Sequence, residues 1–164
     1  VTPNVVSKIL PNIKTPKKTN CILNIHYKLN RTHNEIKLPD GSFFVGVIGG
    51  VVDWIFKKKN ILSITISAAN YLNNLDNDKI SKIVWEDVKK VFNLGTVKKP
   101  KYKIIREKMA TFVQSPEEIF RKPKMYTKYK NLFLAGDWVD TGLPATIEGA
   151  ITSGYNVANY INKI

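Results

Sequence analysis

The segment 131–154, NLFLAGDWVDTGLPATIEGAITSG, constrains the fold more than any other part of the chain. Its first residues, NLFLAG, are apolar and favour a short β-strand that ends at Gly136. A helix is expected from about Pro144 to Ile161, because proline suits the first turn of a helix. A strand joined to a helix by a short turn is typical of the edge at which open α/β sheets bind ligands. The expected buried stripe of the helix consists of Ile147, Ala150, Ile151, Gly154, Ala158 and Ile161.

The turn within this segment carries polar groups suited to a ligand. Asp137 follows the expected strand, where a carboxylate accepts hydrogen bonds from sugar or polyol hydroxyls. The amides of Ala145, Thr146 and Ile147 would be unsatisfied donors at the helix start, which favours a phosphate or a delocalised anion. A purely structural junction is the alternative at this point, with Asp137 as a loop acid and the glycines as packing devices.

The rest of the chain predicts a β-rich region with one helix. CILNIHYKL (21–29) alternates between apolar and polar residues, as a half-buried strand does. FFVGVIGG, DWIFKK and ILSITISAA follow as short β-prone runs whose spacing predicts an antiparallel meander, and KYKIIREKMATF alternates again. Helical spacing of apolar residues predicts a helix over about 78–92. The proline-marked segments 1–20 and 114–130 are expected to be loops.

Composition limits the partners. The net charge of +13 is compatible with nucleic acid or an anionic membrane surface, but the lysines are scattered and fit a lysine-rich composition, so no nucleic acid is expected. The single cysteine, Cys21, excludes an internal disulfide, and no metal-ligand spacing is present, so no metal site is expected. The chain has no apolar run of about 20 residues.

The junction motif resembles a known family. NLFLAGDW followed by TGLPATIEGAITSG resembles the C-terminal flavin-contacting motif of the flavin amine oxidase and phytoene desaturase superfamily. Within it, the motif is most similar to the squalene-associated FAD-dependent desaturases, the hydroxysqualene dehydroxylases. ILNIHYKL, VGVIGGVVDWIF, LSITISAA and IIREKMATF agree, so the resemblance covers nearly the whole chain. It implies an α/β fold (α+β mixed) that forms the C-terminal part of a two-domain, Rossmann-type FAD oxidoreductase with a β-sheet substrate domain.

The resemblance also implies a division of the chain. We expect 1–18 to be the exit from the FAD domain and a linker, and 19–115 to be a portion of the substrate-binding domain with its helix at about 78–92. We expect 116–130 to be a connecting loop and 131–164 to be the C-terminal strand–helix segment of the FAD domain.

The site residues follow from the same resemblance. It implies FAD contacts from Gly136, Asp137, Trp138, Gly142, Pro144, Ala145, Thr146 and Ile147.

Residues outside the junction have weaker support. Arg106 and Lys108 are weak catalytic candidates, with structural pairing as the alternative. Trp54 and Phe56 are candidates for lining a substrate tunnel, although a core position is favoured for both, as for Phe43 and Phe44. His26 is expected to be an ordinary, exposed or hydrogen-bonded histidine. Asp140 is expected to be a turn acid.

The implied activity is the reductive dehydroxylation of hydroxysqualene, a C30 isoprenoid, to squalene in hopanoid-type lipid synthesis. A carotenoid desaturase or an amine oxidase of the same superfamily is the close alternative, and a basic nucleic-acid or acidic-partner binding module is the alternative from another class. A non-catalytic remnant that folds without binding a cofactor is a further alternative.

The chain departs from the family in one respect. No G-x-G-x-x-G fingerprint is present, and the first residue is Val1, so we expect the C-terminal portion of a longer protein, inactive without its N-terminal half. An apolar substrate also implies a cytoplasmic protein peripherally associated with the anionic inner membrane.

Overall fold

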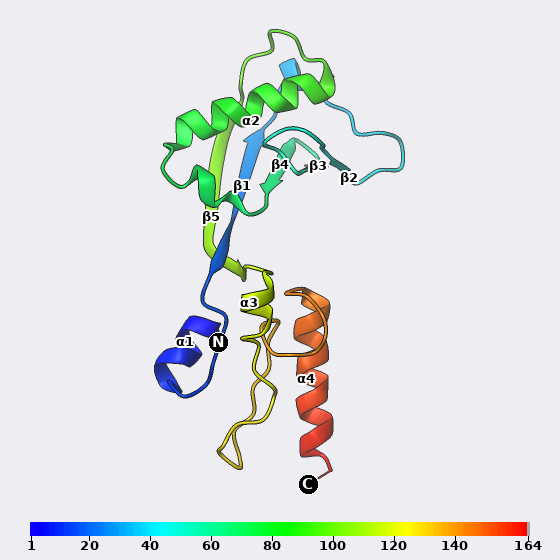
Figure 1. Cartoon of the computed structure of the whole chain (residues 1–164). Coiled ribbons are helices and arrows are strands. Elements are labelled where there is room, and N and C mark those ends of the chain that lie inside the picture. The colour runs from blue at the N-terminus through cyan, green and yellow to red at the C-terminus, as the bar shows by residue number, and fades with distance from the viewer. Residues whose placement is uncertain (164) are drawn as a thin grey trace. The chain divides into compact units, whose positions relative to one another are not determined.

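The structure, a computed structural model, describes residues 1–163 and divides into two compact units (Figure 1). Unit 1 combines Val1–Thr19 with Thr111–Ile164, and unit 2 spans Asn20–Ala110. The segment 131–154 therefore lies in unit 1, while the β-prone runs lie in unit 2. None of the described helices has the length and apolarity needed to cross a bilayer.

Unit 2 is built on a mixed α/β arrangement of one five-stranded sheet, whose strands lie in the order β2-β3-β4-β1-β5. β2, β3 and β4 form the predicted antiparallel meander, and β4 pairs antiparallel with β1. The strands span Thr19–Lys28 (β1), Phe44–Gly46 (β2), Trp54–Lys58 (β3), Ile61–Ile66 (β4) and Lys101–Phe112 (β5). Two 3-10 helices, Arg31–His33 (η1) and Ala69–Leu72 (η2), lie in the connections.

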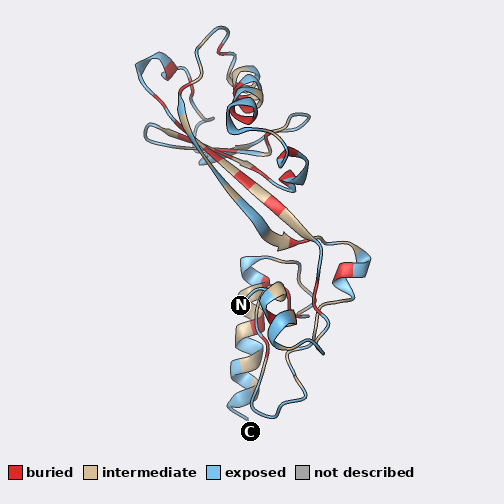
Figure 2. Ribbon diagram, turned by 90° about the vertical axis from the view of Figure 1, so that its left-hand side faces the viewer, coloured by how far each residue is buried: buried red, intermediate tan, exposed pale blue. Residues whose placement is uncertain are grey.

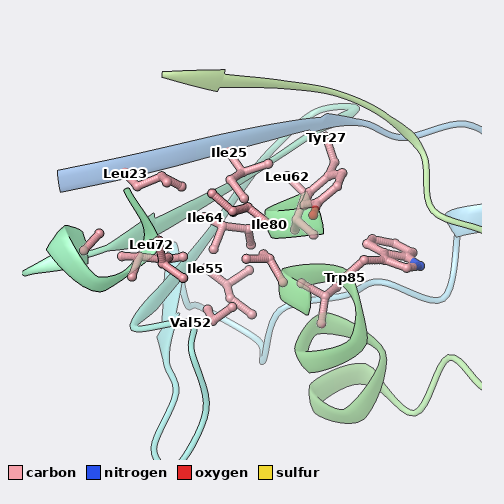
Figure 3. Packing of buried hydrophobic residues seen from close by; sticks show 14 of the residues in the cluster. Leu23, Ile25, Tyr27, Val52, Ile55, Leu62, Ile64, Leu72, Ile80 and Trp85 are labelled. Carbon is pink, nitrogen blue, oxygen red and sulfur yellow. The ribbon is translucent and has the colours of Figure 1, made fainter. Parts of the chain in front are cut away.

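One face of the sheet forms the core of unit 2 together with α2 (Asn77–Phe92). Alternate residues of β1 and β4 are buried, so that Ile25 lies opposite Ile64, and Ile64 opposite Ile55 on β3. Figure 3 shows these side chains packed beside Ile80 of α2. This is the pattern expected of strands with one covered face.

The predicted helix at 78–92 is confirmed, with α2 beginning one residue earlier. Asp76 caps its start by accepting a hydrogen bond from the Lys79 amide at 2.8 Å, which satisfies one of the free donors of the first turn. Asn93, at a φ of 52°, ends it in the left-handed conformation.

No described element covers the opposite face of the sheet, which corrects the core position favoured for Phe44, Trp54 and Phe56; Phe43, which precedes β2, is exposed as well. Trp54 and Phe56 are 42% and 39% exposed, and Phe43 and Phe44 are 85% and 50% exposed. On β3 only Ile55 points into the core, because side chains alternate along a strand and α2 covers one face alone.

The described residues of unit 1 form the helices α1 (Pro3–Ile9), α3 (Pro116–Ile119) and α4 (Ile147–Ile161). Helices α1 and α3 lie in segments expected to be loops, and both begin at a proline. The unit has a small core of Val6, Phe112, Leu134, Trp138 and Val139. The buried carboxylate of Glu118 joins its two chain segments by accepting a hydrogen bond from the Lys17 amide at 2.5 Å.

Two further predictions for unit 1 are wrong. The strand expected at 131–136 is present only as a single β-bridge between Tyr126 and Phe133, because no second extended segment continues the ladder. The stripe expected to be buried on α4 is largely exposed, with Ile147, Ile151 and Ile161 at 81%, 51% and 48% (Figure 2). Ala150 and Gly154 of this stripe are half-buried, and only Gly149 and Ser153 among the described residues of α4 are buried.

Replacing Tyr27 by phenylalanine should destabilise the chain by about 1 kcal/mol, because the change removes one buried hydrogen bond. The Tyr27 hydroxyl is buried and donates to the Ser81 carbonyl at 2.7 Å. Urea unfolding measures the effect. Tyr71→Phe, at a 61% exposed residue of the same unit, is the control and should change stability little at neutral pH.

The pH dependence offers a second measurement on the same variant. Burial raises the pKa of Tyr27 well above its ordinary value of 10.0. Above about pH 10 the unfolded chain loses this proton while the folded chain keeps it, so stability falls as the pH rises. The wild type should therefore lose stability more steeply than Tyr27→Phe in this range; equal slopes would contradict the assignment.

Candidate functional site

The candidate site is the 137–147 loop, which follows Gly136 and leads into α4 within unit 1. The helix begins at Ile147, three residues later than the Pro144 start that we predicted. Thr146 determines this start, because its side-chain oxygen accepts a hydrogen bond from the Gly149 amide at 3.1 Å. Pro144 therefore lies in the loop before the helix.

The amides at the end of the loop are available to a ligand. The amides of Ala145, Thr146 and Ile147 donate no hydrogen bond to another described residue. Because α4 has 15 residues, its dipole adds positive partial charge at this end. The arrangement suits an anion or a carbonyl oxygen with developing negative charge.

Short-range hydrogen bonds shape the turn itself. Gly142 has a φ of +76°, which favours glycine. Its amide donates to Asp140 Oδ1, and the Leu143 amide donates to Thr141 Oγ1, both at 3.3 Å. Asp140 is thus a turn acid, as predicted.

Asp137 is half-buried, and its carboxylate accepts no hydrogen bond from any described residue. The neighbouring backbone is fixed, because the Gly136 amide donates to the buried Ser153 hydroxyl of α4 at 2.8 Å. The sequence reasoning did not identify Ser153, although its spacing of four residues from Gly149 places both on one helix face. Asp137 therefore offers a free carboxylate on a fixed backbone.

Trp138 and Gly136 depend on each other. Trp138 is buried in the core of unit 1, and its indole N–H donates to the Val1 carbonyl at 3.1 Å. A Cβ at Gly136, where φ is +151°, would lie 2.5 Å from the Trp138 indole nitrogen. The packing of Trp138 is thus sufficient reason for glycine at position 136.

The weaker candidates lie in unit 2. The Arg106 guanidinium donates to the Leu75 carbonyl at 3.0 Å and to Asn77 Oδ1 at 2.8 Å, which supports its structural role. Lys108 is exposed and forms no ion pair with another described residue. His26 is hydrogen-bonded to Ser63 on the neighbouring strand, as expected. Between residues 1 and 163, no three His, Cys, Asp or Glu side chains gather to hold a metal.

The donors and acceptors of the 137–147 loop fit the polar parts of FAD. A free carboxylate at Asp137 suits a ribityl or ribose hydroxyl, and free amides at Ala145, Thr146 and Ile147 suit a flavin carbonyl or a phosphate. Gly149 allows the loop to fold back onto the helix, since a Cβ there would lie 2.7 Å from the Pro144 carbonyl oxygen.

The chain is similar to known proteins in both sequence and fold. Residues 49–162 match the sequence model of the family described as flavin containing amine oxidoreductase. The hydroxysqualene dehydroxylase of Zymomonas mobilis is 42% identical over 155 residues, which cover 94% of this chain and 36% of that protein. The hydroxysqualene dehydroxylases of Rhodopseudomonas palustris and Sinorhizobium fredii are 37% and 36% identical and cover 98% and 97% of this chain.

The chain spans little more than a third of the length of these curated relatives, 36–37%. Among solved structures, one assigned as a protoporphyrinogen oxidase from Exiguobacterium superposes with a TM-score of 0.64. The superposed region covers 98% of this chain and 40% of that protein, at 16% sequence identity. This similarity therefore supports the fold alone.

Replacing Gly149 by alanine should destabilise unit 1 by roughly 1–3 kcal/mol, because the new methyl group would overlap the Pro144 carbonyl. Gly154→Ala is the matched control on the same helix. A Cβ there meets nothing within 4 Å, so this variant should be neutral or gain up to about 1 kcal/mol in helix propensity. Urea unfolding of both variants measures the difference, and equal stabilities would contradict the close contact.

Proposed function

The chain belongs to the family of flavin-containing amine oxidoreductases, and from this premise we propose that it is the C-terminal portion of an FAD-dependent oxidoreductase acting on a C30 isoprenoid. The proposed reaction is the reductive dehydroxylation of hydroxysqualene to squalene. The observation that carries this proposal is the similarity to three hydroxysqualene dehydroxylases, each over at least 94% of this chain.

In this proposal the 137–147 loop binds FAD. Bound and reduced, FAD would supply the hydride that replaces the hydroxyl group of the substrate, which would leave as water after protonation. Asp137 holds a hydroxyl of the cofactor by accepting its hydrogen bond. The amides of Ala145, Thr146 and Ile147 stabilise negative charge on the reduced ring, since they are already oriented and need no rearrangement.

The uncovered face of the sheet in unit 2 is the proposed surface for the isoprenoid chain. Phe44 and Trp54 lie with ring centroids 5.5 Å apart, and Phe44 and Phe56 lie 5.6 Å apart. These three rings form an exposed aromatic cluster on the neighbouring strands β2 and β3. An apolar chain bound there would exclude water from its own surface and from the rings. The Arg106 guanidinium is hydrogen-bonded within unit 2, so we assign Arg106 no role in the proposed chemistry.

In this proposal, FAD binding also needs a part of the protein that corresponds to the sequence of the longer relatives not matched by this chain. The 164 residues contain no G-x-G-x-x-G fingerprint, which holds the pyrophosphate in dinucleotide-binding domains. The chain alone should therefore bind FAD weakly or not at all, and should be inactive.

Because the proposed substrate is apolar and would be drawn from a bilayer, we also propose peripheral association with the anionic cytoplasmic face of the inner membrane. The net charge of +13 would contribute electrostatic attraction. The chain should sediment with anionic vesicles at low salt and be released at high salt, since salt screens surface charges. No sedimentation under either condition would contradict this.

The activity test uses the full-length protein, that is, this portion with its upstream coding sequence. Incubation with FAD, a reductant and hydroxysqualene should give squalene, detected by mass spectrometry. Asp137→Ala should lose most bound flavin, seen in the visible spectrum, and with it the activity. Asp40→Ala, an exposed loop acid of unit 2, is the matched control and should retain both.

The other outcomes distinguish the alternatives. Bound flavin without squalene formation would favour a carotenoid desaturase or an amine oxidase of the same superfamily. Absence of bound flavin in the wild type would contradict the oxidoreductase proposal, and salt-sensitive binding of nucleic acid would then support the basic binding module.

A further inference from the structure

Lys122 makes a contact that the proposed function does not use. Its ammonium group donates a hydrogen bond to the Leu143 carbonyl at 2.6 Å, and its side chain is half-buried. The ammonium nitrogen also lies 5.9 Å from the centre of the Phe112 ring, within the range of a cation–π interaction. Lys122 and both of its partners belong to unit 1.

The contact is part of a longer association between two segments. The Pro123 carbonyl accepts from the Asp140 amide, and the Met125 carbonyl accepts from the Leu134 amide, both at 2.8 Å. Residues 122–125 therefore run beside the segment that leads into and forms the 137–147 loop. Lys122 provides the contact furthest along this loop, next to Pro144.

The Leu143–Pro144 pair is held from two sides. On one side the Pro144 carbonyl packs so closely on Gly149 that a Cβ there would lie 2.7 Å away. On the other side Lys122 holds the Leu143 carbonyl. A hydrogen bond from a charged donor is stronger than one between neutral groups, so this contact restricts the peptide units before the free amides.

We propose that Lys122 is a positioning residue, which fixes the Leu143 carbonyl and thereby orients the amides of Ala145, Thr146 and Ile147 for the flavin. This inference rests on the proposed function of the 137–147 loop. Lys122 itself is not required to touch the cofactor. Its effect is expected in the order of the loop and in FAD affinity, with the core of unit 1 unchanged.

The test uses the full-length protein with its flavin removed and then restored. Lys122→Met should increase amide hydrogen exchange in peptides covering 141–148, because the loop opens more often. It should also raise the dissociation constant for FAD about tenfold, the effect of losing one charge-assisted hydrogen bond. Lys122→Arg, which keeps a charged donor, should restore most of both.

Lys124→Met is the matched control. Lys124 is exposed, and its ammonium forms no hydrogen bond or ion pair with another described residue. The Lys124→Met substitution removes the same charge two residues away and should change neither the hydrogen exchange of the loop nor the affinity for FAD. If Lys122→Met does not fold, Lys122→Gln, which keeps a neutral donor, should show a smaller change in the same direction.

The possible failures are distinguishable. If the wild type binds FAD and Lys122→Met matches Lys124→Met in both exchange and affinity, the positioning role is wrong while the proposed function stands. If the wild type binds no FAD, the proposed function is wrong, and so is the role of Lys122 in orienting the loop for the flavin. Faster exchange throughout unit 1 in Lys122→Met, not rescued by arginine, would show a general packing role and overturn the proposal.

Discussion

The packing of α2 against a single face of the five-stranded sheet determines the arrangement of unit 2. Burial of Ile25, Ile55 and Ile64 beneath this helix removes one face from solvent, while no described element covers the other. Because side chains alternate along β3, the residues on either side of Ile55 must then be Trp54 and Phe56 on the open face. The exposed aromatic cluster proposed for the isoprenoid is a direct consequence of this one-sided core.

Unit 1 has a much smaller core, and its function as a binding element depends on local contacts. Trp138 packs over Gly136, Ser153 holds the Gly136 amide, and Gly149 accepts the close approach of Pro144. These contacts place Asp137 and the free amides on one fixed loop. The apolar residues of α4 that remain exposed are consistent with relatives that are almost three times as long, whose additional sequence is available to cover them.

Sequence reasoning succeeded where a pattern repeats along one element. The spacing of apolar residues located α2 to within one residue, and the alternation in CILNIHYKL predicted the half-buried strand β1. It failed at 131–136, because an apolar extended run becomes a strand only beside a partner strand, and Tyr126 supplies a single bridge. It also placed the start of α4 at Pro144, although capping by Thr146 moves the start to Ile147.

The sequence by itself determined the family motif, the candidate carboxylate at Asp137 and the two faces of β1, since these depend on residue type and on local periodicity. Only the tertiary structure decided which face of the sheet α2 covers. It also decided that Arg106 donates a hydrogen bond to the Leu75 carbonyl before α2, and that Lys122 reaches the Leu143 carbonyl. These contacts join residues about 20 to 30 positions apart in the chain, and no local pattern encodes them.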